Sequence, residues 1–113
     1  MTSKRHELLN LTLDTRHVAK HLPDTPESQR LIRAEGMAHL FINEATMMRV
    51  IATIQQQGEY LGQIRGHARW GYQFDQPIGY RLAETGKTIP LYYGEMKISG
   101  GKYHVIPRTK PSP

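Results

Sequence analysis

The sequence predicts a single α+β domain in which N-terminal helices pack on a curved antiparallel β-sheet. In the first half, apolar residues follow the i, i+3, i+4, i+7 spacing of a buried helical face, at Met47, Val50, Ile51 and Ile54. After Gly58 the spacing changes to two, which is typical of half-buried strands. Helices followed by strands indicate an α+β layout, and 113 residues suit one hydrophobic core.

The first predicted helix covers residues 16–22. Asp14 or Thr15 can cap its start, because their side-chain oxygens accept hydrogen bonds from free backbone N–H groups. Pro23 ends it, since proline disfavours helical geometry in the preceding residue.

Two further helices have clear ends. Thr25 caps a helix that begins at Pro26, a residue that suits the first helical position, and Gly36 ends it. Asn43 caps the most strongly periodic helix, residues 44–57, which Gly58 closes.

The predicted strands are residues 38–42, 60–65, 70–74, 77–82, 89–98 and 102–107. Residues 84–87 and 99–101 contain the glycines of tight hairpin turns. We expect residues 1–13 and 110–113 to be loosely ordered, because chain ends without strong apolar patterning fray.

The net charge indicates which classes of partner the protein could bind. Fifteen Lys and Arg against ten Asp and Glu give a net charge of +5, which favours a nucleic acid or an acidic protein as partner. The alternative is a protein whose positive charge has no role in binding a partner.

The chain has no cysteine, which excludes disulfides and thiol nucleophiles. It has no membrane-length apolar run and no apolar signal core, so we expect no membrane partner and action in the cytoplasm, or delivery within a larger effector.

Histidines beside cations near the start are candidate catalytic residues. His17 and His21 are four residues apart and would share a helix face. His21 is favoured, because Lys20, Arg30 and Arg33 surround it in sequence, and nearby cations keep an imidazole neutral and able to accept a proton. The alternative is that these histidines are packed or solvent-facing. Neither a H-E-x-x-H motif nor cysteine is present, so we expect no metal and no other cofactor.

A third histidine lies in the last predicted strand. His104 shares a face with Lys102 and Ile106, while Tyr103 points the other way. Arg108 follows at the strand end, where a cation can hold a phosphate. The alternative is a core histidine whose hydrogen bonds are satisfied.

A second basic cluster contains Arg65, His67, Arg69 and Trp70. Arginine and tryptophan together suit phosphate contact and base stacking. The alternative is a hairpin loop anchored by its tryptophan.

The order of these segments resembles the RNase A-like toxin domains at the C-terminal ends of contact-dependent inhibition proteins and other polymorphic toxins. Residues 17–22, HVAKHL, are similar to the H-x-x-K-H-V/L element of that family. Arg30-Leu31 is similar to its Arg-Leu pair, residues 41–46 lead into a helix as in the family, and residues 104–107, HVIP, are similar to its final strand. The family belongs to the barnase, EndoU, colicin and RelE group.

The resemblance implies a metal-independent endoribonuclease, and a toxin neutralised by an acidic immunity or antitoxin protein. It gives His21 an acid–base role and Arg30 the role of phosphate cation, with Arg33 as a rival. The family carries Thr and Tyr two residues apart in its last strand, and here His104 and Ile106 occupy those positions.

The tyrosine role therefore needs another residue, for which Tyr103, Tyr80 and Thr109 are candidates. In the expected reaction, one of His21 and His104 takes the proton of a 2′-hydroxyl. A 2′,3′-cyclic phosphate forms, and the other histidine protonates the leaving oxygen. RNA is the expected substrate, with tRNA as one candidate.

The full sets of expected site residues are as follows. The catalytic candidates are His21, His104, Arg30, His17, Tyr103 and Thr109. The substrate-binding candidates are Lys20, Arg33, Arg65, Arg69, Trp70, Lys102 and Arg108. Two other interpretations stay open: a non-catalytic basic module that binds nucleic acid or protein, and an immunity or adaptor protein.

Overall fold

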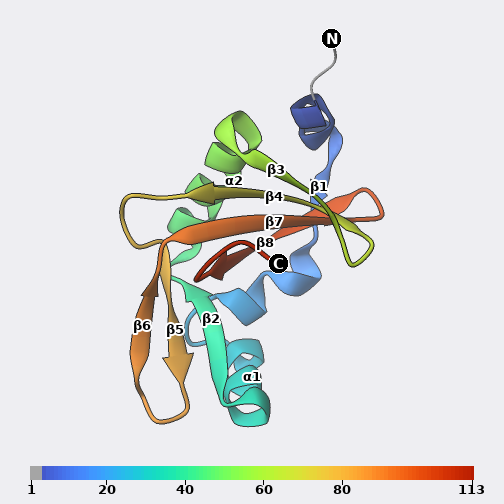
Figure 1. Ribbon diagram of the computed structural model, residues 1–113. Helices are drawn as coiled ribbons and strands as arrows, with labels where there is room; N and C mark the ends of the chain where they lie inside the picture. Colours follow the sequence, from blue (N-terminus) through green and yellow to red (C-terminus); the bar gives the residue numbers. More distant parts are fainter. Residues whose placement is uncertain (1–3) are drawn as a thin grey trace.

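Two β-sheets meet along the last strand of the chain in the computed structural model, which describes residues 4–113 (Figure 1). The larger sheet is mixed and has the order β1-β8-β7-β4-β3, and the smaller is antiparallel with the order β2-β5-β6. The strands are β1 Thr12–Leu13, β2 Met37–Phe41, β3 Glu59–Ile64, β4 His67–Gln73, β5 Gly79–Ala83, β6 Thr88–Leu91, β7 Tyr93–Ser99 and β8 Lys102–Arg108. The helices are α1 Pro26–Glu35 and α2 Glu44–Gln57, with 3-10 helices η1 Lys4–Asn10, η2 Thr15–His17 and η3 Ala19–His21. The protein is therefore an α+β domain, as predicted.

Both predicted long helices are confirmed with their caps. The Asn43 side chain accepts a hydrogen bond from the Thr46 amide at 2.8 Å, and Thr25 accepts one from the Ser28 amide at 3.0 Å. Gly36 ends α1 in the left-handed conformation, with φ of 82°, which glycine adopts without steric cost.

The predicted helix over residues 16–22 is wrong, because this stretch forms the two 3-10 turns η2 and η3. Asp14, one of the two predicted caps, caps η2, and its side chain accepts a bond from the Arg16 amide at 3.2 Å. The segment is held at one end by the pairing of β1 with β8 and stops at Pro23. So short a segment has little helical stability of its own, and packing decides its conformation.

The predicted single strand over residues 89–98 is two strands in different sheets. Strand β6 pairs with β5, whereas β7 pairs with β4 and β8. The chain crosses between the sheets at Tyr92, whose carbonyl accepts a bond from the Phe74 amide at 2.8 Å. The alternation changes phase across this point, from Ile89 and Leu91 to Met96 and Ile98, which is the sequence signal of the break.

Both chain ends are more ordered than the sequence predicts. Leu8 is buried in the core, and β1 pairs in parallel with β8, a pairing that the expected antiparallel sheet lacked. At the other end, Ser112 is buried and hydrogen-bonded to Glu95. The expectation for residues 1–3 lies outside the described residues.

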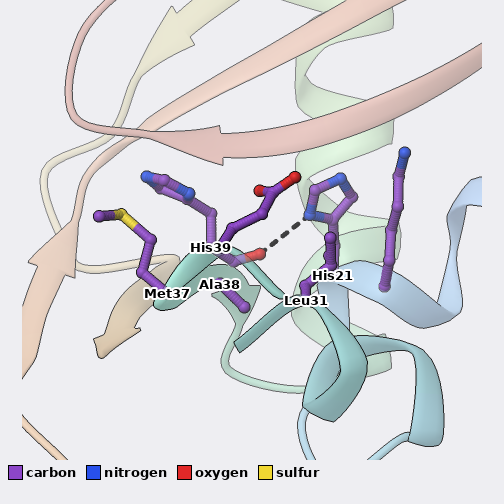
Figure 2. A pocket seen from close by; sticks show the side chains of 7 residues that line it. His21, Leu31, Met37, Ala38 and His39 are labelled. Carbon is purple, nitrogen blue, oxygen red and sulfur yellow. Dashed lines mark hydrogen bonds between the residues drawn. The ribbon is translucent and has the colours of Figure 1, made fainter. Parts of the chain in front are cut away.

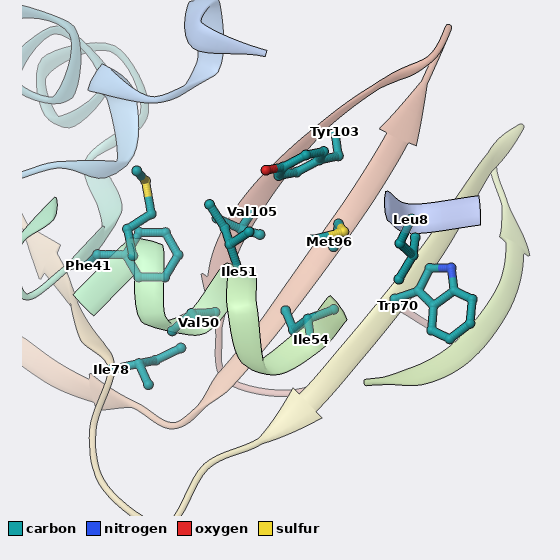
Figure 3. Close-up of a cluster of buried hydrophobic side chains, with 11 residues drawn as sticks. Leu8, Phe41, Val50, Ile51, Ile54, Trp70, Ile78, Met96, Tyr103 and Val105 are labelled. Atoms are coloured by element: carbon teal, nitrogen blue, oxygen red, sulfur yellow. The ribbon is translucent and has the colours of Figure 1, made fainter. Parts of the chain in front are cut away.

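Helix α2 covers one face of the larger sheet and builds the core there (Figure 3). Val50, Ile51 and Ile54 from α2 lie with Met96 of β7 and Val105 of β8 in one buried cluster. Since successive strand residues point to opposite faces, the other face of β8 presents different side chains. The candidate site lies on that other face. No helix in residues 4–113 is long and apolar enough to cross a membrane.

The two adjacent methionines of α2 test this packing. Met47 is 2% exposed and Met48 is 48% exposed. We expect Met47→Ala to lower the unfolding free energy by about 2–5 kcal/mol, because it leaves a cavity in the core. Met48→Ala on the same helix should cost less than about 0.5 kcal/mol. Urea denaturation measures both, and equal costs would contradict the assigned buried face.

Candidate active site

The short parallel pairing of β1 with β8 brings the N-terminal segment to His104. Thr12 lies opposite Lys102 and Leu13 opposite Tyr103, and the Asp14 amide donates to the Tyr103 carbonyl at 2.8 Å. The 3-10 turn η2, which begins one residue after Asp14, therefore starts beside the strand that carries His104.

The imidazole that contacts His104 is that of His17. Their ring centroids are 4.4 Å apart with an interplanar angle of 28°, which is a stacked arrangement. From sequence, His21 was the favoured partner. The structure instead places His21 outside the stacked pair, although its charge acts on the His104 ring and the His17 charge acts on His21.

His21 has a structural tie of its own. Its Nδ1 lies 2.9 Å from the carbonyl oxygen of His39 in β2 (Figure 2). Because a carbonyl only accepts, Nδ1 carries the proton and donates it, which leaves Nε2 as an acceptor. The bond joins η3 to the smaller sheet, so His21 holds the two halves of the site together.

Cations gather on the same face. Lys97 of β7 is the register partner of His104, and partners across an antiparallel pair point to the same side. The Lys20 and Lys97 charges both act on His17 and His104. Lys97 was not a candidate from the sequence, because the predicted turn over residues 99–101 would put Met96 opposite His104. The observed pairing of Ser99 with Lys102 moves Lys97 into that position.

All these imidazoles are held neutral. Burial lowers the pKa of His104 to about 3, and the neighbouring His17 and Lys20 charges add to the shift. Burial likewise lowers the pKa of His21 to about 4. The pKa of His17 is also lowered, first by burial and then by Lys20. Neutral imidazoles can accept protons near pH 7.

A buried carboxylate distinguishes His17 from His104. Asp14 Oδ2 lies 3.7 Å from His17 Nε2, and its charge raises the pKa of His17 against the other effects. Arg16 binds this carboxylate through two hydrogen bonds, at 3.0 and 2.8 Å, and the side-chain bonds hold the pKa of Asp14 well below its usual range. The His17 side chain is 34% exposed, so it is the more accessible imidazole of the stacked pair. From the sequence, Asp14 was predicted only as a cap for the helix over residues 16–22.

A cavity of about 410 Å³ opens beside this cluster and is lined by Lys20, His21, Leu31, Glu35, Met37, Ala38 and His39. Figure 2 shows the His21 and His39 rings on opposite sides of it. Lys20 also lines a neighbouring pocket with Arg16 and Arg30. The structure thus places Arg30 next to Lys20, while Arg33 is exposed further along α1.

The other candidate residues in and after the last strand lie in different places. Tyr103 points into the core with 7% exposure, on the face opposite His104, and burial raises its pKa. Its hydroxyl is therefore no part of this site. Thr109 and Arg108 line a smaller pocket with His39, and Lys102 is exposed at the start of β8.

The predicted basic cluster on the β3–β4 hairpin does not form one exposed surface. Arg65 is exposed in a two-residue turn, with φ of 51°. Trp70 is 5% exposed in the core, and Arg69, pointing to the opposite face, is 4% exposed. The structure favours the alternative in which the tryptophan anchors the hairpin.

Arg69 serves a buried ion pair that holds the C-terminal tail. Its Nη1 donates to Glu95 Oε2 at 3.0 Å and to Ser112 Oγ at 3.2 Å. The Ser112 amide and hydroxyl donate to the same carboxylate at 2.9 and 2.7 Å. The tail therefore lies against the face of the sheet that also carries His104.

In residues 4–113, no three His, Cys, Asp or Glu side chains converge in a way that could hold a metal ion. The candidate site is a cluster of imidazoles and lysines next to a cavity in an α+β domain.

The family model described as domain of unknown function DUF6972 matches residues 9–112, and the chain belongs to this family. No curated protein and no solved structure matches the sequence.

The neutral histidines predict how stability depends on pH. In the unfolded chain, imidazoles protonate near pH 6.5, whereas folded His21 and His104 resist protonation down to about pH 4 and 3. The unfolded state then binds more protons, so the unfolding free energy falls as pH drops from about 6.5 to 5. The slope reaches about 1.4 kcal/mol per pH unit for each histidine. Asp14 adds to it only at lower pH, near its unfolded pKa of about 3.9.

Urea denaturation at pH 7, 6 and 5 measures this slope. His104→Gln should reduce it, while Arg49→Gln, which replaces an exposed side chain on α2 that stays charged over this pH range, should leave it unchanged. A slope insensitive to His104→Gln would show that this imidazole titrates normally.

The buried ion pair gives a separate stability prediction. Glu95→Gln leaves the buried Arg69 charge without its carboxylate, and we expect a loss of about 3–5 kcal/mol in unfolding free energy. Glu59→Gln, an exposed glutamate on β3, is the matched control, with an expected change within about 0.5 kcal/mol. Chemical denaturation measures the unfolding free energy of both variants. Equal losses in the two would contradict the assigned ion pair.

Proposed function

We propose that this protein is a metal-independent endoribonuclease. The observation that carries the proposal is the stacked pair of His17 and His104, flanked by Lys20 and Lys97 beside an open cavity. RNA cleavage through its own 2′-hydroxyl needs one proton acceptor, one proton donor and positive charge at the phosphate. The cluster offers all three.

His104 suits the role of general base. It is the more buried of the pair, and its cationic neighbours keep it neutral. In the proposed step it takes the proton from a 2′-hydroxyl, whose oxygen then bonds to phosphorus. The bond from phosphorus to the 5′-oxygen breaks, and a 2′,3′-cyclic phosphate forms.

His17 suits the role of general acid. The Asp14 carboxylate stabilises its imidazolium form, and its exposure leaves it open to substrate. A bound phosphodiester brings negative charge, which raises the pKa of a nearby imidazole and favours its protonation. His17 then gives its proton to the leaving 5′-oxygen, while Lys20 and Lys97 stabilise the charged phosphorane.

The wider role follows from the same features. The net charge of +5 supports RNA as substrate and an acidic immunity or antitoxin protein as partner. The resemblance to polymorphic-toxin ribonucleases supports a toxin that acts on cytoplasmic RNA, tRNA among the candidates. Arg30 and Arg16, in the pocket next to Lys20, would contact the RNA backbone.

Cleavage of RNA in EDTA tests the proposal. Purified protein should cut tRNA or total RNA, and products should carry 2′,3′-cyclic phosphates. His104→Gln and His17→Gln should each lower the rate by about 10²–10⁴, the usual effect of removing a general acid or base. His67→Gln is the matched control and should retain full activity.

A 2′-deoxynucleotide at the cleaved position should block the reaction, since the attacking hydroxyl is gone. Folded protein that cleaves no RNA between pH 5 and 8 would overturn the proposal.

A second candidate function is a non-catalytic RNA-binding module. The 9% exposure of both His21 and His104 favours it, because buried imidazoles also serve as packing groups. It predicts binding that falls steeply with salt, no cleavage, and no effect of His17→Gln on affinity.

A further inference from the structure

A second group of cations meets where the two sheets adjoin. His39 of β2 and Arg81 of β5 are register partners, so their side chains leave the smaller sheet on the same side. Arg108 ends β8 of the larger sheet, and the Arg81 and Arg108 charges both act on His39, whose pKa burial and these charges lower. Three strands thus direct cationic or proton-binding groups to one place.

A pocket of about 100 Å³ lies there, lined by His39, Ile106, Arg108 and Thr109. It is well below the roughly 300–1,000 Å³ of pockets that enclose whole small-molecule ligands. A group the size of a phosphate suits it, since arginine donors and a threonine hydroxyl bind phosphate oxygens. Arg108 Nε donates to the Lys110 carbonyl at 3.2 Å and lies 4.0 Å from Glu95 Oε2, an oxygen that Arg69 and Ser112 bind more closely.

The pocket adjoins the proposed active site. His39 lines both cavities, and its carbonyl holds His21. Ile106 follows His104 by two residues on the same face of β8, a separation of about 7 Å along the strand. A single RNA strand can therefore place one phosphate at His104 and another at this pocket.

We propose that this pocket binds a non-scissile phosphate of the RNA, which makes the substrate longer than a dinucleotide. This inference rests on the proposed ribonuclease function and adds a subsite to it. Arg81 is not among the lining residues, but it is the register partner of His39, which lines the pocket, and its charge acts there. Because Arg81 takes no part in the stacked catalytic pair, it is the residue that tests the subsite.

Substrate length and Arg81 together provide the test. The wild type should cleave a tetranucleotide with kcat/KM about tenfold or more above that of a dinucleotide, because hydrogen bonds to charged groups contribute at least that much. Arg81→Gln should abolish this advantage and change dinucleotide cleavage less than twofold. Arg49→Gln, an exposed arginine on α2, is the matched control and should keep the advantage.

Binding of an all-2′-deoxy tetranucleotide, which cannot be cleaved, gives a second readout. Arg81→Gln should lower the slope of log affinity against log salt by about 0.7, the value for one phosphate contact of a single strand. Arg81→Lys keeps the charge and should keep that slope. The comparison of the two variants shows that the change in Arg81→Gln comes from the lost charge and not from a disturbed fold.

Equal cleavage of dinucleotides and tetranucleotides by the wild type would overturn the subsite while leaving the ribonuclease standing. An unchanged salt slope in Arg81→Gln would do the same. Absence of any cleavage would overturn the proposed function, and the binding measurement would then show separately whether the pocket holds a phosphate.

Discussion

The two-residue parallel pairing between β1 and β8 is the constraint on which the site depends. Through it, and through the Asp14 amide that donates to Tyr103, a segment near the start of the chain is fixed to the last strand. Closing a loop of roughly ninety residues costs conformational entropy, although the cost grows only slowly with length. Together with the bond from His21 to the His39 carbonyl, this pairing fixes His17 against His104.

The alternation of side chains along β8 places core residues on one face of the strand and the candidate catalytic residue on the other. Tyr103 and Val105 point to α2 and are buried in the core, whereas His104 points to the face where η2 and Lys97 lie. The same rule places Trp70 in the core and directs Arg69 to the buried carboxylate of Glu95. A strand packed firmly on one face can thus hold reactive groups rigidly on the other.

Burial and charge act on the imidazoles in the same direction. Desolvation penalises the imidazolium form, and Lys20 and Lys97 repel it, so His104 remains a base across the physiological range. Asp14 opposes both effects at His17 alone. Two similar side chains in contact therefore have different proton affinities, which is the asymmetry that acid–base catalysis by a histidine pair needs.

The sequence by itself determined the α+β class, the ends of α1 and α2, the alternation of β8 and the tight turns, because these depend on local capping and periodicity. Only the tertiary structure decided that His17, and not His21, stacks on His104, that residues 16–22 form 3-10 turns, and that Arg69 and Trp70 are buried. It also decided the meeting of His39, Arg81 and Arg108. Each of these depends on contacts between residues distant in the chain, whose energies local spacing does not encode.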